Sequence, residues 1–252
     1  MILFTPNPDS IIKAYMLSKL TGDSVISEGS DSLLLFSGNA VINAGDYDIS
    51  ELSAQYGDVF LRDTRWLFTY KGNELRSMIS TALRHSAEHK LGIILKSVED
   101  CFSKGADYCL NGASAYGKKL RSLCSDVDHE VWRMVGFIRF RPAGSRCLVA
   151  KPLLSYDTAD LILREFQKRY PNHKVVLLTD DRAVCMYFGS IYLEDKSKYE
   201  SFFAEDSFDE IWEDYYKSQY IESRKNIKLA SARIPKKYWN WLQEGSILKG
   251  EE

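Results

Sequence analysis

The chain has 252 residues, of which 45% are hydrophobic, 13% aromatic and 27% charged. That composition is enough for one large globular core or two small ones, and it excludes a disordered or fibrous protein. The formal net charge is −2, so the total does not indicate a general nucleic-acid binder, although a near-neutral total can hide a basic face.

Membrane and redox signals are weak along the whole sequence. No apolar run is long enough to cross a bilayer, and the N-terminal residues lack the basic and apolar regions of a secretory signal. The five cysteines are widely spaced and form no CxxC pair, which excludes a zinc ribbon or redox pair of that kind. We therefore expect a cytoplasmic protein with reduced thiols, without membrane association, metal or cofactor.

Residues 1–110 are expected to form a small α/β part with a helical middle. A short strand begins it, and Asp9 and Ser10 can cap the helix that follows. A hairpin is expected at residues 33–42. Further segments are an irregular aromatic, β-forming stretch over residues 58–70 and a helical pattern over residues 73–103, which Gly92 can divide into two helices.

Residues 111–252 are expected to form the second domain. Its predicted elements, in chain order, are a helix at 114–134, strands at 136–141 and 147–151, a helix at 157–170, strands at 174–178 and 183–188, and helices at 208–220 and 235–242. The order strand, strand, helix, strand, strand with flanking helices predicts an α+β fold.

Two short motifs resemble ligand-binding sites, but each lacks a residue that such a site needs. The stretch from Gly112 to Lys119 resembles a phosphate-binding loop, but Lys119 stands where that loop needs Ser or Thr, and residues 107–111 are a poor strand. A helix N-terminus with solvated lysines is the alternative. His85 and His89 are spaced to share a metal on one helix face, but no third ligand can be identified, and exposed helix histidines are the alternative.

Acidic residues and one histidine are the catalytic candidates. Asp180 and Asp181, next to Arg182, could act as an acid–base cluster, although Asp residues also simply make turns. His129 could form a catalytic pair with its acidic neighbours, although helix capping or a solvated position on a helix is the more usual role. Asp157 is the fourth candidate.

Two basic stretches carry the strongest functional signal. The first holds arginines on the expected strand 136–141, where Phe137, Arg139 and Arg141 share a face and could combine phosphate contact with base stacking. The second follows an acidic segment at 194–214. The nucleic-acid-binding candidates are Phe137, Arg139, Arg141, Arg182, Arg224, Lys225, Asn226, Lys236, Lys237 and Trp241. Alternatively, the C-terminal aromatics anchor a helix to the core and the cations pair with the acidic segment.

The C-terminal residues also resemble a known family. The motifs that carry the resemblance, in order, are residues 129–140, Tyr156-Asp157, residues 166–171, residues 178–182, Met186-Tyr187, residues 212–216, residues 224–226 and residues 234–239. In this order and spacing they resemble the domain-of-unknown-function 4130 family, over about residues 110–245.

The resemblance implies a role in DNA repair or DNA metabolism and a protein partner, because family members are typically encoded beside a radical SAM protein. It implies no catalytic residues. We expect a DNA-binding accessory partner of such a protein. An enzyme acting on nucleic acid or nucleotides, and a protein-interaction subunit that does not touch DNA, are the alternatives.

Overall fold

The computed structural model describes residues 1–28, 41–203, 234–239 and 241–242, and it divides into two compact units, Met1–His129 and Glu130–Glu252. The boundary falls within one helix, α6 (Ala115–Phe137). The expected domain boundary after residue 110 concerns independent folding and stays a prediction. Most of the expected hairpin, the expected helix at 208–220, and Arg224, Lys225 and Asn226 lie outside the described residues.

Unit 1 begins with a small parallel sheet. Its strands are β1 (Ile2–Phe4), β2 (Val25–Ser27) and β3 (Ile42–Asn43), in the order β2-β1-β3. Helix α1 (Pro8–Thr21) connects β1 to β2, and the side chain of Asn7 caps it by accepting from the Ser10 N–H at 2.9 Å. Pro8 at the first helical turn suits this start, because its missing N–H would have no helical partner there.

Helices form the rest of unit 1. They are η2 (Ala44–Asp46), α2 (Ile49–Phe60), η3 (Arg65–Phe68), α3 (Tyr70–Leu83), α4 (Lys90–Lys104), α5 (Ala106–Leu110) and the first part of α6. The β-forming stretch expected at 58–70 was wrong, because it contains the end of α2 and the 3₁₀ turn η3. The break expected at Gly92 was also wrong: residues 84–89 separate α3 from α4, and Gly92 lies inside α4.

Unit 2 contains a five-stranded mixed sheet. Its strands are β4 (Arg141–Pro142), β5 (Cys147–Ala150), β6 (Lys174–Leu178), β7 (Ala183–Tyr187) and β8 (Ser190–Glu194), in that order across the sheet. β5 and β6 are parallel and joined by α7 (Ala159–Arg169), and the other neighbours are antiparallel. The predicted α+β class is confirmed, and β8 is an additional strand.

One predicted strand is mostly absent, and its first two residues are helical. Residues 136–141 were expected to be extended, but α6 continues to Phe137 and only Arg141 belongs to β4. Met134 and Ile138, four residues apart, are both buried, and the Ile138 N–H donates to the Met134 carbonyl at 2.9 Å. The helical spacing of these two apolar side chains therefore outweighs the alternation of apolar and basic residues that predicted a strand.

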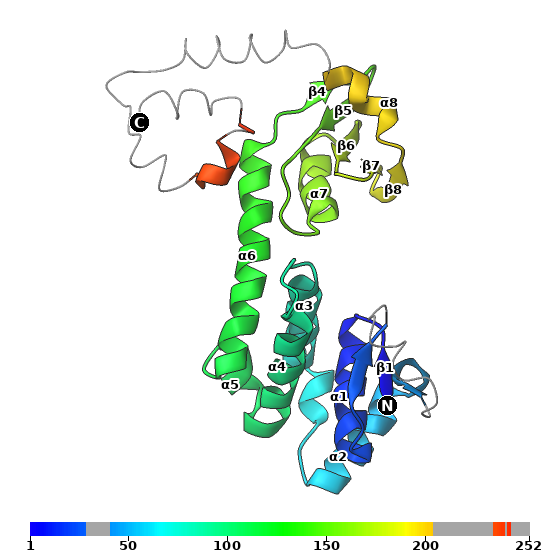
Figure 1. The fold of residues 1–252 in the computed structure, drawn as a ribbon, viewed down its shortest axis with the longest axis vertical. Coiled ribbons are helices and arrows are strands. Elements are labelled where there is room, and N and C mark those ends of the chain that lie inside the picture. Colours follow the sequence, from blue (N-terminus) through cyan, green and yellow to red (C-terminus); the bar gives the residue numbers. More distant parts are fainter. Residues whose placement is uncertain (29–40, 204–233, 240, 243–252) are drawn as a thin grey trace, which may run out of the picture. The chain divides into compact units, whose positions relative to one another are not determined.

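Different elements cover the two faces of the sheet among the described residues. Helix α7 lies on one face (Figure 1). Side chains alternate along each strand, so Val175 and Leu177 point to this face and pack with Ile162 and Phe166 of α7. Val176 and Leu178 face the other way, where Tyr199 of α8 (Ser197–Glu200) and Phe203 of η4 (Ser201–Phe203) pack.

The C-terminal segment is a single turn within the described residues. A helix was expected at 235–242, but the structure has the 3₁₀ turn η6 (Lys236–Tyr238), followed by a bond from the Leu242 N–H to the Tyr238 carbonyl at 2.8 Å. Tyr238 and Trp239 are buried. Among the helices of the described ranges, none has the length and apolar character needed to cross a membrane.

Candidate functional site

The carboxyl ends of β5 and β6 form one edge of the unit 2 sheet. Because the two strands are parallel, the residues after them, Lys151 and Thr179-Asp180, meet at that edge. In open α/β sheets ligands bind outside the carboxyl ends of the strands. A cavity of about 340 Å³ lies here, lined by Lys151, Leu178, Thr179, Asp180, Lys196, Glu200 and Phe203. We call it the edge cavity.

Opposite charges line the edge cavity without all being paired. The Lys196 ammonium donates to the Asp180 carbonyl at 2.8 Å and lies 3.8 Å from the Glu200 carboxylate. Within the described part of the chain, the Lys151 ammonium and the Asp180 carboxylate have no hydrogen bond or ion pair. Both side chains are exposed, so each can take a ligand group without breaking an existing contact.

Arg141 reaches the same cavity through Phe203. Its guanidinium carbon lies 5.0 Å from the centre of the Phe203 ring, which lines the cavity, and its Nη1 donates to the Phe202 carbonyl at 3.3 Å. A guanidinium at this distance from a ring is within cation–π range. Arg141, predicted as a phosphate contact on a strand, is therefore placed at the rim of the edge cavity by the start of β4.

The loop that leaves β5 is fixed by a buried carboxylate. Glu130 of α6 is 1% exposed. Its oxygens accept from the Ser155 N–H at 2.7 Å, the Tyr156 N–H at 3.1 Å and the Thr158 hydroxyl at 2.9 Å. A buried carboxylate is costly unless its oxygens are hydrogen-bonded, and these three bonds satisfy it while setting the path of residues 151–158.

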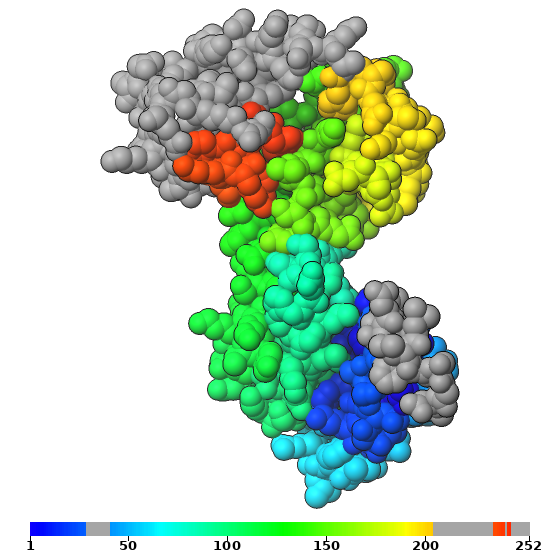
Figure 2. All heavy atoms as spheres, in the orientation of Figure 1, coloured from blue at the N-terminus to red at the C-terminus, as the bar shows by residue number. Residues whose placement is uncertain are grey.

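The C-terminal segment is bonded to this same loop. Lys237 donates to the Ser155 hydroxyl at 2.7 Å, and the Trp241 indole N–H donates to the Lys151 carbonyl at 2.7 Å. In Figure 2 the orange-red surface of residues 234–242 adjoins green residues of unit 2. Two predicted binding residues that lie far beyond the loop in sequence are thereby placed beside it.

The turn after β6 holds three further predicted residues. The Thr179 N–H and hydroxyl both donate to the Arg182 carbonyl at 2.9 Å, which closes the turn. The Thr179 hydroxyl also bonds the Asp181 carboxylate, which holds the pKa of Asp181 below its usual value. Arg182 lies 3.1 Å from Asp181. Asp181 therefore has a structural role in this turn, whereas Asp180 lines the edge cavity and Arg182 is exposed beside it.

Other predicted binding residues lie elsewhere in unit 2. Phe137 packs edge-on against Tyr238, with ring centres 6.1 Å apart. Arg139 donates to the Gly136 carbonyl at 2.8 Å and is partly buried. Because residues 136–140 are not a strand, Phe137, Arg139 and Arg141 do not share a strand face. Lys236 is exposed on η6, with its ammonium 5.4 Å from the Trp239 ring centre.

The catalytic candidates are not gathered by the described contacts. His129, on α6, has its Nδ1 3.5 Å from the Ser125 hydroxyl. Asp157 is exposed on the loop that Glu130 fixes, and Asp180 and Asp181 lie in the turn after β6. In the described ranges no three His, Cys, Asp or Glu side chains are grouped so that they could hold a metal ion. Catalysis through these residues stays a prediction.

The two ligand-like motifs are explained by local structure. His85 accepts from the Ala87 N–H at 2.9 Å in the connection between α3 and α4, and His89 precedes α4, so the two do not share a helix face. The segment before Gly112 is helix α5, not the strand that a phosphate-binding loop needs. Gly117 lies so close to α5 that an added Cβ would be 2.1 Å from the Cys109 carbonyl oxygen.

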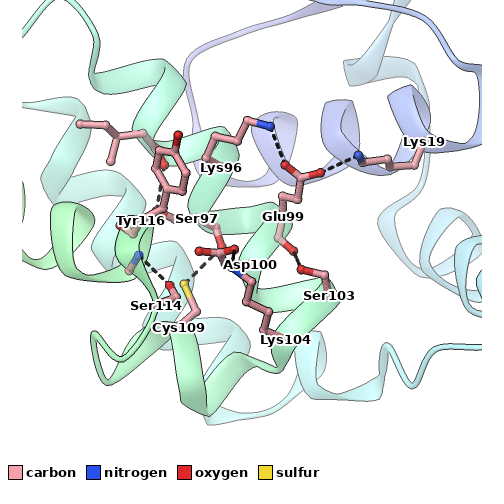
Figure 3. Close-up of polar contacts among 12 residues, drawn as sticks. Lys19, Lys96, Ser97, Glu99, Asp100, Ser103, Lys104, Cys109, Ser114 and Tyr116 are labelled. Carbon is pink, nitrogen blue, oxygen red and sulfur yellow. Dashed lines mark hydrogen bonds and ion pairs between the residues drawn. The ribbon is translucent and has the colours of Figure 1, made fainter.

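Unit 1 contains a separate polar cluster between α4, α5 and α6 (Figure 3). The buried Asp100 pairs with Lys104 at 2.7 Å, and the Cys109 thiol donates to the Ser97 carbonyl at 3.3 Å. A hydrogen bond to Cys109, together with burial, raises the pKa of Cys101. The Cys109 bond joins α5 to α4, and the Ser97 hydroxyl donates to the Tyr116 carbonyl of α6 at 3.0 Å, so this cluster ties the three helices together.

Comparison with known proteins identifies the family. The model of the family named Domain of unknown function (DUF4130) matches residues 88–244, which is more than half of the chain. The chain belongs to this family, as the sequence motifs predicted. A search of curated proteins finds no match. The matched range includes α6, all of the unit 2 sheet and the residues around the edge cavity.

Sequence reasoning missed several residues of this site. Lys151, at the end of the strand expected at 147–151, was not among the predicted binding residues, although its position at the end of one of two strands joined by a helix is a usable signal. Lys196 follows β8, which was not predicted.

Trp132 is 82% exposed, and nothing in the sequence distinguishes it from a core tryptophan. It follows Glu130 by two positions, about 200° around the helix, so it points away from the loop that Glu130 holds.

Proposed function

We propose that this protein binds DNA through the edge of unit 2 at which β5 and β6 end, as an accessory partner of a radical SAM protein in DNA repair or metabolism. The observation that carries the proposal is the position of Lys151 and Lys237. Both ammonium groups lie on or beside the loop fixed by Glu130, and neither has a carboxylate partner among the residues that the structure describes.

Phosphate contact is the chemistry that these cations favour. Lysines neutralise phosphates as point charges, and arginines add directional hydrogen bonds. Arg141 lies at the rim of the edge cavity and Arg182 in the adjoining turn. Arg182 and Lys196 have carboxylate neighbours, so Lys151 and Lys237 supply the larger share of the attraction.

The partner part of the proposal is supported by the family resemblance. Members of this family are typically encoded beside a radical SAM protein, and the motifs that carry the resemblance include the residues that build the loop and turn of this edge. Binding of DNA by this chain would position a substrate for the partner, which supplies the chemistry.

Binding of labelled single-stranded and duplex DNA, followed by fluorescence anisotropy at about 50 and about 200 mM salt, tests the proposal. We expect binding at the lower concentration and a loss of affinity of about tenfold or more at the higher, because phosphate contacts release counterions. The variant Lys168→Ala, which changes an exposed lysine of α7, should bind as the parent does. Absence of binding at the lower salt concentration, with and without the partner, would refute the proposal.

A second candidate function, binding of a protein partner through α6, is favoured by one observation. Trp132 is 82% exposed on α6, and exposed tryptophans are typical of the central residues of protein interfaces. We expect the variant Trp132→Gln to reduce co-purification with the radical SAM partner after nuclease treatment. If Trp132→Gln co-purifies as the parent does, this surface is not the partner-binding site.

A further inference from the structure

We infer that the edge cavity holds a single nucleotide unit of the bound DNA, with its phosphate at Lys151 and the N–H donors of its base at Asp180. This inference rests on the proposed function, because it specifies which part of the DNA enters the site. It concerns the cavity, whereas the DNA-binding proposal concerns the whole cationic edge.

The charged residues of the cavity suit a ligand that carries both an anionic group and a hydrogen-bond donor. Among the described residues, Lys151 offers an ammonium without a partner, which suits an anion, and Asp180 offers a carboxylate without a partner, which suits a hydrogen-bond donor. A bare phosphate would satisfy only Lys151 and would lie near the Asp180 and Glu200 carboxylates. A nucleotide of DNA carries a phosphate together with the N–H donors of its base, and therefore satisfies both.

The remaining walls suit the ring of a base. Leu178 and Phe203 are the apolar lining residues. Phe203 is held by the guanidinium of Arg141 5.0 Å from its ring centre and by packing on the same sheet face as Leu178. Apolar and aromatic walls with a few fixed polar groups are typical of small-ligand sites, and the volume of about 340 Å³ is at the small end of their range.

The backbone that carries the polar groups of the cavity is fixed before any ligand arrives. The bond from Lys196 to the Asp180 carbonyl, 2.8 Å long, and the Thr179 bonds to the Arg182 carbonyl hold the turn that carries Asp180. The Trp241 indole holds the Lys151 carbonyl. A site that is ordered in advance loses less entropy when it binds a ligand.

A nucleotide in this cavity cannot stay stacked in a duplex. Enzymes and binding proteins that enclose a base need single-stranded DNA or must move the base out of the helix, which costs the energy of unstacking and unpairing it. We therefore expect single-stranded DNA to bind more tightly than duplex DNA of the same length.

Calorimetric titration of the full chain with three probes tests the inference: deoxyadenosine monophosphate, deoxyadenosine and inorganic phosphate. We expect the monophosphate to bind about tenfold or more tightly than either fragment, and Lys151→Ala and Asp180→Asn each to weaken it by about three- to tenfold, since each removes one polar interaction. Lys168→Ala should bind it as the parent does.

The outcomes separate the two proposals. Equal affinity for phosphate and the monophosphate would show an anion site only and would overturn the nucleotide inference. Monophosphate binding unchanged by both Lys151→Ala and Asp180→Asn would also overturn it. DNA binding without monophosphate binding would overturn the inference and leave the DNA-binding proposal intact, and absence of both would refute both.

Discussion

In unit 1, the polar side chains that follow the parallel strands β1 and β2 are hydrogen-bonded to each other. In unit 2, the charged side chains of Lys151 and Asp180, which follow the parallel strands β5 and β6, are not. After β1, the Thr5 hydroxyl donates to the Glu28 carboxylate beyond β2 at 2.8 Å, and the Thr5 N–H donates to the Ser10 hydroxyl at 3.1 Å. After β5 and β6, Lys151 and Asp180 line a cavity without a partner in the described residues.

This difference shows why one strand–helix–strand arrangement is structural and the other is a candidate binding site. Polar groups that are satisfied inside the protein have little left to offer a ligand, while unsatisfied and exposed ones retain their full capacity. At the unit 2 edge, Glu130 and Trp241 bond backbone groups of the loop and leave the two charged side chains available.

Removing the Glu130 carboxylate should have the largest effect, because this carboxylate holds the loop after β5. We expect Glu130→Ala to lower the free energy of unfolding by about 3–5 kcal/mol, because two backbone N–H groups and the Thr158 hydroxyl would be left without their acceptor inside the protein. Chemical denaturation of the variant measures the effect. Asp128→Ala, an exposed neighbour on the same helix, should change stability by less than about 0.5 kcal/mol. Equal stability of the two variants would show that the loop does not depend on Glu130.

Two glycines of α6 provide a matched pair, one in each unit. Gly117→Ala should destabilise the protein by about 1–3 kcal/mol, because the new Cβ would lie 2.1 Å from the Cys109 carbonyl oxygen and the backbone must move. Gly136→Ala should stabilise it by about 0.5–1 kcal/mol, because an added Cβ meets nothing within 4 Å and alanine is the better helix former. Thermal unfolding shifts of the same sign for both would contradict the packing described for α6.

Periodicity and turn chemistry predicted much of this fold. Apolar spacing located α1, α6 and α7, and short apolar runs bounded by turns located β5, β6 and β7. The error at residues 136–140 arose because Phe137, Ile138, Arg139 and Phe140 alternate like a strand, while the burial of Ile138 beside Met134 is a tertiary contact. β8 was missed because Tyr192 and Leu193 are exposed and give no clear alternation.

The candidate site was only partly predictable. Arg141, Arg182, Lys237 and Trp241 were identified from local charge and aromatic content, and the structure places them around the β5–β6 edge. That Lys151 and Asp180 face one cavity depends on the parallel pairing of β5 with β6, and on the start of α8 bringing Lys196 over the edge. Neither the pairing nor the position of α8 is encoded in the local sequence.

An ion pair at the other end of β6 from the edge cavity should make stability depend on pH. Lys174 and Glu194 lie 2.7 Å apart. The bond to Lys174 lowers the pKa of Glu194, and although burial lowers the pKa of Lys174, its bonds to Glu194 and Tyr199 raise it overall. The pair therefore stabilises the folded state above the unfolded pKa of glutamate, about 4.3, and below that of lysine, about 10.4.

The variant Glu194→Gln measures this contribution. At neutral pH we expect it to cost about 1 kcal/mol of unfolding free energy, and the difference from the parent should disappear as the pH falls through the lowered pKa of Glu194, since the parent carboxyl is then neutral too. Glu165→Gln, which removes the exposed pair with Lys168, should cost only a few tenths of a kcal/mol. A cost for Glu194→Gln that does not change between about pH 7 and about pH 3 would contradict the assignment.

The salt dependence of single-stranded DNA binding tests the central claim most directly, because it counts the phosphates that the protein neutralises. For the double variant Lys151→Ala, Lys237→Ala we predict that the slope of log affinity against log salt falls by about 1.4, which is about 0.7 for each single-strand phosphate that the variant no longer neutralises. Lys168→Ala should keep the parent slope. A double variant that keeps both the slope and the affinity of the parent would contradict the placement of DNA at the β5–β6 edge.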